Sequence, residues 1–233
     1  MLDVGCGTGG SALPAAELVG PGGSVVGVDL AGKLLEIART KAATRRLGNA
    51  EFRLGDMTNL GYPDGHFDAV ISVFSVHFVP DMSAMVRELW RMAKPGGQLA
   101  ITTWGPRVFE PAASALKDII RTIRPDLYSA SNAWDRITSP EQVRMLLQRG
   151  GVPNAEVVME SGNQVLRSPE DWWTIVLGSG MRSVVDAMGV ETAKHVHDRN
   201  IGWLRDNGVA SIETNVIYAI ATKEKTQSAH VIE

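Results

Sequence analysis

The sequence predicts an α/β protein built on a mostly parallel sheet with helices on both faces. Apolar strand-like segments alternate with helix-like segments, the first strand runs into a glycine-rich turn, and an Ala/Leu-rich helix follows that turn. This alternation is typical of parallel sheets whose crossover helices cover both faces. A chain of 233 residues can bury a substantial core without a second domain, so we expect a single domain over residues 1–233.

The individual elements follow from hydrophobic period and turn signals. Short apolar segments bounded by turn residues predict strands near 1–4, 24–29, 50–54, 67–73, 97–103 and 155–161, with a last strand over 212–222. Helical patterns lie near 10–19, 32–46, 82–93, 110–123 and 139–149. Ser139 is the expected N-cap of the last of these, with Pro140 as its first helical residue. An insertion over 163–207 predicts helices near 168–177, 180–188 and 190–206.

Residues 2–10, Leu-Asp-Val-Gly-Cys-Gly-Thr-Gly-Gly, form the most informative segment. A strand, a glycine turn and a helix bring bare backbone N–H groups and a helix N-terminus against a ligand. Glycine is needed because a Cβ would block both the tight turn and the close approach of a cofactor. The spacing is ambiguous, since Gly5, Gly7 and Gly10 fit a dinucleotide pattern while Gly5, Gly7 and Gly9 fit G-x-G-x-G.

Asp3, two residues before the first glycine, distinguishes between the possible ligands. A carboxylate at this place would repel a pyrophosphate and attract an ammonium group. S-adenosylmethionine, which carries an amino group and a sulfonium, therefore fits better than NAD.

Composition excludes several classes of function. The net charge is −3, and no basic cluster exceeds Arg45-Arg46, which argues against a nucleic-acid partner. No apolar run has the length of a membrane span, and no signal peptide is visible. The single cysteine, Cys6, excludes an intramolecular disulfide and a multi-cysteine metal site. We expect a cytoplasmic protein without a metal, a monomer or homodimer, acting on a small molecule.

Four further segments follow the glycine turn in order: 25–30 (VVGVDL), 52–57 (FRLGDM), 67–78 (FDAVISVFSVHF) and 91–101 (RMAKPGGQLAI). Together the five motifs resemble the class I S-adenosylmethionine-dependent methyltransferases over about residues 1–103. Within that class they resemble the small-molecule group that includes the ubiquinone/menaquinone-biosynthesis (type 11) enzymes. The resemblance implies a Rossmann-like sheet of seven strands in the order 3-2-1-4-5-7-6, with the last strand antiparallel.

The resemblance also implies cofactor roles. Asp3, Gly5, Gly7 and Gly9 would hold the methionine end. Asp29 would accept hydrogen bonds from the ribose hydroxyls, although it could instead be only the N-cap of the next helix. Asp56 would meet the adenine amino group, or else be a solvated turn acid. The remaining cofactor positions are Leu30, Met57, Ser72 and Val73, the last two contributing mainly backbone atoms.

His77 follows the fourth strand, where relatives often carry a histidine at the mouth of the active site. Its ordinary pKa would suit a general base, but a packed structural histidine is an equal alternative. His195 and His197 lie two apart on a helix and point to different faces, so we interpret them as surface residues rather than metal ligands.

Aromatic residues after the motifs predict a flat apolar substrate pocket: Trp104, Tyr128, Trp134, Trp172 and Trp173. We expect residues 105–137 and 163–207 to form a lid over it. Ser72-Val73-Phe74-Ser75 replaces the N-P-P-Y sequence of adenine- and glutamine-modifying relatives. The expected reaction is methyl transfer to O or C of a small, largely apolar metabolite such as a quinone, phenol or polyketide.

An alternative is a truncated or non-catalytic S-adenosylmethionine-binding protein. Relatives usually have a few dozen residues before the glycine strand, forming helices that close over the cofactor. Here the glycine strand begins at residue 1, so we expect those helices to be missing.

Overall fold

The computed structural model describes residues 1–225, which fall into two compact units. Unit 1 comprises Met1–Thr103, Ile137–Met159 and the chain from Ile217, and unit 2 comprises Trp104–Arg136 and Glu160–Val216. The sequence predicted one core, whereas each unit has buried apolar clusters of its own. The two segments expected to form a lid lie almost wholly in unit 2.

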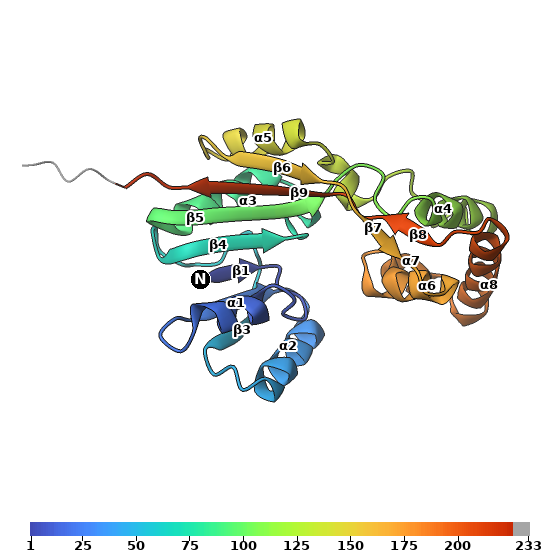
Figure 1. Ribbon diagram of the computed structural model, residues 1–233, viewed down its shortest axis with the longest axis horizontal. Coiled ribbons are helices and arrows are strands. Elements are labelled where there is room, and N and C mark those ends of the chain that lie inside the picture. Colours follow the sequence, from blue (N-terminus) through green and yellow to red (C-terminus); the bar gives the residue numbers. More distant parts are fainter. Residues whose placement is uncertain (226–233) are drawn as a thin grey trace, which may run out of the picture. The chain divides into compact units, whose positions relative to one another are not determined.

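Unit 1 is built on a seven-stranded sheet in the order β3-β2-β1-β4-β5-β9-β6 (Figure 1). The strands are β1 (Leu2–Val4), β2 (Val25–Asp29), β3 (Ala50–Leu54), β4 (Phe67–Val73), β5 (Ala93–Trp104), β6 (Glu156–Glu160) and β9 (Val216–Thr222). Strands β1 to β5 pair in parallel, and β9 runs antiparallel between β5 and β6. The predicted topology is confirmed, with the predicted seventh strand being β9.

Helices cover unit 1 from both sides (Figure 1). One apolar cluster joins α1 (Ala12–Val19) and α2 (Gly32–Thr44) to one face of β2 and β3. A larger cluster joins α3 (Met82–Met92) and α5 (Pro140–Arg149) to the other face of the seven-stranded sheet. Helix α5 begins as predicted: Ser139 and Gln142 form a reciprocal capping box, with Pro140 in the first turn.

The predicted strand over 212–222 is in fact two strands. Strand β8 (Ser211–Glu213) ends before Asn215 and pairs with β7 (Asn163–Val165), which the sequence analysis missed. The Asn215 side chain accounts for the break, because its Nδ2 donates to the carbonyl of Pro106 at 2.9 Å while its backbone carbonyl accepts from Gly105 N–H at 2.7 Å. Three consecutive polar residues, Glu213, Thr214 and Asn215, interrupt the apolar alternation at the break, and the sequence analysis did not use this signal.

Unit 2 is mainly helical. It contains α4 (Ala112–Ile123), α6 (Pro169–Gly178), α7 (Arg182–Ala187), α8 (Val190–Asp206) and the β7–β8 pair, with a short 3₁₀ helix at Ala133–Arg136. Trp172 lies at its centre with no exposed surface, and its indole N–H donates to Asn200 Oδ1 at 2.7 Å. A buried indole N–H needs such a partner, so this pair fixes α6 against α8.

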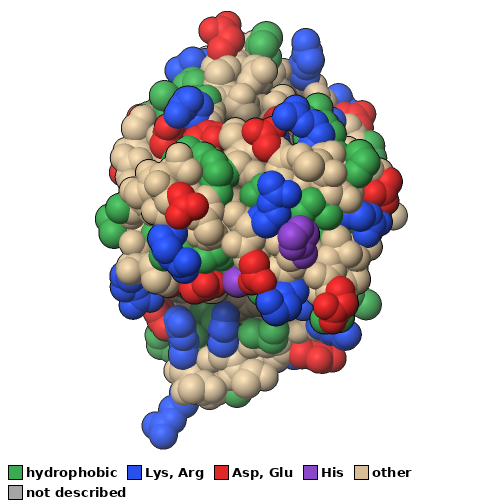
Figure 2. Space-filling view, turned by 90° about the vertical axis from the view of Figure 1, so that its right-hand side faces the viewer, with side chains coloured by type: hydrophobic (Ala, Val, Ile, Leu, Met, Phe, Trp, Pro, Cys, Tyr) green, Lys and Arg blue, Asp and Glu red, His purple; other side chains and the backbone are tan. Residues whose placement is uncertain are grey.

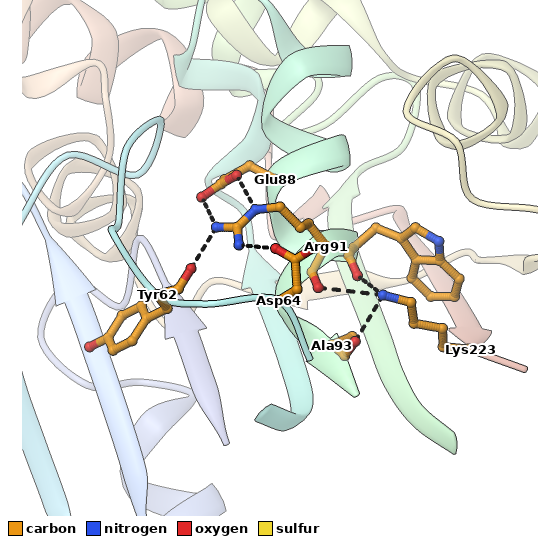
Figure 3. Close-up of polar contacts among 7 residues, drawn as sticks. Tyr62, Asp64, Glu88, Arg91, Ala93 and Lys223 are labelled. Carbon is orange, nitrogen blue, oxygen red and sulfur yellow. Dashed lines mark hydrogen bonds and ion pairs between the residues drawn. The ribbon is translucent and has the colours of Figure 1, made fainter. Parts of the chain in front are cut away.

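A polar network holds the C-terminal end of α3 in unit 1 (Figure 3). Arg91 donates to both oxygens of Glu88, to Asp64 and to the carbonyl of Tyr62. The Lys223 ammonium donates to the carbonyls of Trp90 and Ala93, each at 2.9 Å. The carbonyl of Trp90 also accepts from the N–H of Ala93, the C-cap residue of α3, so Lys223, just after β9, adds hydrogen bonds that stabilise the end of α3.

Candidate cofactor site

The glycine turn links β1 to α1 and is tied to β2 by its own backbone. The N–H groups of Gly5 and Cys6 both donate to the carbonyl of Val28, at 2.8 and 3.1 Å. Gly5, Gly7 and Gly9 all have positive φ, at 74°, 53° and 80°. Side chains are strained in this region, so the backbone itself requires the three predicted glycines.

Gly5 and Gly7 differ in what surrounds them. A Cβ at Gly5 would collide with the Ser75 side chain, whereas a Cβ at Gly7 would meet nothing within 4 Å. Gly5 is therefore needed for packing between the turn and the segment after β4. Gly7 borders open space, where a cofactor could approach the backbone closely.

Asp3, at the centre of β1, is fully buried. Ser11 Oγ donates to its Oδ2 at 2.6 Å, while Oδ1 accepts no hydrogen bond from the part of the chain that the structure describes. Burial raises the pKa of Asp3 to about 6, against the opposing effect of the Ser11 hydrogen bond. A buried carboxylate oxygen without a donor fits a cationic ligand group, so the residues present fit the ammonium end of S-adenosylmethionine.

Asp29 shapes the loops at the ends of β1 and β2. Its Oδ2 accepts from Gly7 N–H and its Oδ1 from Ala31 N–H, both at 2.8 Å. Ala31, and not Asp29, is the N-cap residue of α2, so the simple capping alternative is not what the structure shows. Each carboxylate oxygen can accept a second bond, which leaves capacity for the ribose hydroxyls.

The segment after β3 carries the predicted adenine-side residues. Asp56 is exposed, and its Oδ1 accepts from both the N–H and the hydroxyl of Thr58, at 2.8 Å each. These two hydrogen bonds lower the pKa of Asp56 and keep it ionised. Met57 is buried near Gly5, and Leu30 is 61% exposed.

The Ser72 side chain is buried and hydrogen-bonded within the protein. Its hydroxyl lies 2.7 Å from Ser75 Oγ, and Ser75 donates in turn to the carbonyl of Val4 at 2.7 Å. Because Ser75 has a single hydroxyl hydrogen, Ser72 must be the donor between them. The contribution of Ser72 backbone atoms and of the half-buried Val73 to the cofactor site stays a prediction.

Sequence reasoning missed Ser75 and Phe74. Ser75 joins β4 to β1 across 71 residues, a separation that no local pattern reveals. Phe74 adopts a positive φ of 54°, which strains a bulky residue directly after β4. Strain of this kind concentrates at functional sites, and the structure places it beside the glycine turn's partner Ser75.

His77 lies in a short 3₁₀ helix, Val76–Phe78, with 1% of its surface exposed. Its ring packs 4.5 Å from that of Phe78 between centroids. This burial matches the packed-histidine alternative, and a place beside the transferred methyl stays a prediction.

His197, which we expected to be a surface residue, makes side-chain contacts with two acidic residues. Its Nδ1 lies 2.9 Å from Asp198, and its Nε2 lies 2.9 Å from Glu170 on α6. The ring also packs edge-on against Trp173 at 4.9 Å. His197 is therefore a contact between α8 and α6 within unit 2.

All five aromatic residues predicted to line a substrate pocket belong to unit 2 and its apolar cluster. Trp134 and Trp172 are buried members of that cluster, and Trp104, Tyr128 and Trp173 pack against it half-buried. Trp172 is core, with its only polar atom already bonded to Asn200. The three half-buried aromatic residues keep exposed surface that a ligand could contact.

The strand order and the glycine turn after β1 are those of a Rossmann-like fold. Residues 2–101 match the family model described as "Methyltransferase domain".

Curated relatives match the same region. Nocamycin O-methyltransferase of Saccharothrix syringae is 42% identical over 102 residues, covering 44% of this chain and 36% of that protein. Demethylmenaquinone methyltransferase of Listeria monocytogenes is 40% identical over 109 residues, covering 46% of each. The chain's match thus spans less than half of the length of these relatives.

A solved structure is similar over nearly the whole chain. The YcgJ protein of Bacillus subtilis superposes with a TM-score of 0.62 at 19% identity, covering 97% of this chain and 92% of that one. This likeness concerns the fold.

Among the described residues, no helix is both long and apolar enough to cross a membrane.

Proposed function

We propose that the protein is an enzyme that transfers a methyl group from S-adenosylmethionine to an oxygen or carbon atom of a small, largely apolar metabolite. The observation that supports this most strongly is the buried Asp3 carboxylate, whose Oδ1 has no donor and lies on the strand before the glycine turn. Ionising a buried carboxylate costs free energy without a cationic partner, and the ammonium group would supply that partner.

The other predicted residues extend the cofactor site from Asp3. Asp29 would bind the ribose hydroxyls while its present bonds keep Gly7 in place. Asp56 would accept from the adenine amino group through Oδ2, because its Oδ1 already accepts two bonds from Thr58. Leu30 and Met57 would supply apolar contacts to the cofactor.

The bound cofactor supplies an electrophilic methyl on a sulfonium, whose C–S electron pair returns to sulfur as the acceptor's new bond to the methyl forms. The chain's residues therefore contribute mainly positioning and exclusion of water. A base is needed only when the acceptor atom must lose a proton, and His77 is the residue we propose for that step.

The apolar acceptor class rests on three observations. The relatives named above are methyltransferases of nocamycin and of demethylmenaquinone by name. The face drawn in Figure 2 mixes acidic and basic side chains, without a continuous basic stripe on that face. Two half-buried aromatic residues, Tyr128 and Trp173, lie in the segments that we propose as the lid, and the half-buried Trp104 lies just before the first of them.

Methyl transfer can be tested directly with cofactor carrying a labelled methyl group. The protein would be incubated with a panel of phenols, quinols and polyketides, and products detected by mass spectrometry. We expect label in at least one member and none with Asp3→Asn. The protein could bind the cofactor and still transfer no label to any member of the panel or to a metabolite extract. That result would favour the non-catalytic alternative.

The role of His77 needs a matched comparison. His77→Ala should reduce turnover by roughly 10²-fold if the ring removes a proton in the transition state. His66→Ala, at an exposed histidine just before β4, should leave turnover unchanged. A loss of only a few-fold in His77→Ala would assign this histidine to packing.

A further inference from the structure

Ser11 occupies the N-cap position of α1, yet its hydroxyl does not cap the helix. A serine at this position ordinarily accepts a hydrogen bond from the first-turn N–H groups. Here the hydroxyl instead donates to Asp3 Oδ2 at 2.6 Å, eight residues back in the sequence. The helix therefore gives up a side-chain cap, and a buried carboxylate gains a short, charge-assisted hydrogen bond.

This bond divides the two oxygens of Asp3 between different tasks. Oδ2 is held by Ser11, while Oδ1 accepts nothing from the described chain. A side chain held at one oxygen cannot rotate freely, so Oδ1 keeps a fixed direction. A fixed, buried oxygen is already oriented for a cationic group and needs no ordering when that group binds.

We propose that Ser11 is a positioning residue for cofactor binding: its hydroxyl orients Asp3 Oδ1 toward the cofactor's ammonium group and favours the ionised carboxylate. This inference rests on the proposed cofactor role of Asp3. Ser11 itself would make no contact with the reacting atoms.

The charges around Asp3 explain why the hydroxyl matters. Burial and the nearby Asp29 carboxylate on β2 both raise the pKa of Asp3. The Cys6 thiol in the turn is neutral near pH 7, because burial raises its pKa to about 12. Two groups lower the pKa of Asp3: the Ser11 hydroxyl and the N–H of Ala12 at the start of α1. Removing the hydroxyl should therefore raise the pKa of Asp3 further.

The test is the pH dependence of S-adenosylhomocysteine affinity, measured by calorimetric titration between pH 5 and 8.5. In the wild-type chain, affinity should fall as the pH drops through about 6, where Asp3 becomes protonated. In Ser11→Ala, the midpoint of that fall should move upward by about one pH unit. Ser11→Thr, which keeps a hydroxyl, should restore the midpoint, and Ser24→Ala in an exposed loop should not move it.

The outcomes separate this inference from the proposed function. If Asp3→Asn binds as tightly as the wild type, the cofactor role of Asp3 fails and the inference fails with it. If Asp3→Asn loses binding but Ser11→Ala keeps the wild-type midpoint, only the role of Ser11 is overturned. A uniform loss of affinity without a shift would likewise assign Ser11 to structure. Ser11→Gly, which keeps a favourable N-cap residue without a hydroxyl, gives the same answer should the alanine variant unfold.

Discussion

The buried Asp3 carboxylate destabilises the free protein when it is ionised. Its pKa rises to about 6 on burial, compared with 3.8 for an exposed aspartate. The folded state therefore binds this proton more tightly than the unfolded state, so stability falls as pH rises from about 4 to about 6 and stays lower above that. The difference corresponds to on the order of 3 kcal/mol at neutral pH.

Asp3→Asn should therefore stabilise the free protein while abolishing cofactor binding. The amide keeps an oxygen for the Ser11 hydroxyl but removes the buried charge. We expect a gain of roughly 2–3 kcal/mol in unfolding free energy at pH 8, shrinking toward zero near pH 4. Urea unfolding of the wild type and of Asp3→Asn at pH 8 and pH 4 measures this difference in unfolding free energy. A variant that is less stable than the wild type at pH 8 would contradict the raised pKa of Asp3.

Gly5 and Gly7 provide a matched pair for separating packing from ligand approach. Gly7→Ala should destabilise the protein by only about 1–2 kcal/mol, the penalty of a positive φ, because nothing lies within 4 Å of its Cβ. Gly5→Ala should lose more, because it carries the same penalty and also collides with Ser75.

Thermal unfolding gives the order of the two variants, and titration with S-adenosylhomocysteine gives their affinity. Gly7→Ala should remain folded and bind weakly. Equal stability of the two variants would show that Ser75 does not pack against the turn as described.

At the residue scale, the sequence indicated the cofactor site where glycines that a tight turn requires stand next to a charged residue. The spacing of the glycines and the acid before them single out Asp3, Gly5, Gly7 and Gly9 in the sequence, and the structure shows positive φ at the three glycines. The hydroxyl contacts of Ser11 and Ser75 were not predictable, because a serine carries no periodic signal and its partner depends on the folded geometry.

Among the elements, the contact between α6 and α8 has its own dependence on pH. Both ring nitrogens of His197 face carboxylate oxygens, so both must carry hydrogen for the two bonds to form. Partial burial lowers the pKa of His197, but the hydrogen bonds and charges of Asp198 and Glu170 outweigh it and raise the pKa above 6.5. This contact is therefore complete below pH 6.5 and is lost as pH rises through the raised pKa.

His197→Gln should lower the thermal stability of the protein at pH 6 and have little effect at pH 9. The groups are partly exposed, so we expect less than about 1 kcal/mol. His195→Gln, on an exposed site of the same helix, is the control and should show no such dependence on pH. A loss in His197→Gln that is equal at both pH values would assign the residue to packing against Trp173 alone.

The element boundaries were predictable where a local signal exists. Ser139, Pro140 and Gln142 mark the start of α5 by their own hydrogen bonds, and the capping box is present. The break between β8 and β9 depends instead on contacts of Asn215 with residues 105 and 106. The polar run Glu213-Thr214-Asn215 marks the break in the sequence, but the partners of Asn215, about 109 residues away along the chain, do not appear in a window of neighbouring residues.

For the whole molecule, the strand order followed from the order of the motifs, while the division into two units did not. Unit 2 assembles from two segments separated by residues 137–159, and each reads as ordinary amphipathic helix in isolation. Only packing shows that they share a core around Trp172 and Leu204. Their role as a lid over the substrate remains a prediction.

The choice of cofactor is the central claim, because it connects Asp3, the glycine turn and the methyltransferase family. Titration calorimetry of the full chain with S-adenosylhomocysteine and, separately, with NADH at pH 8 tests it most directly. We predict saturable binding of S-adenosylhomocysteine at one site and no measurable binding of NADH. Tighter binding of NADH than of S-adenosylhomocysteine would contradict the account.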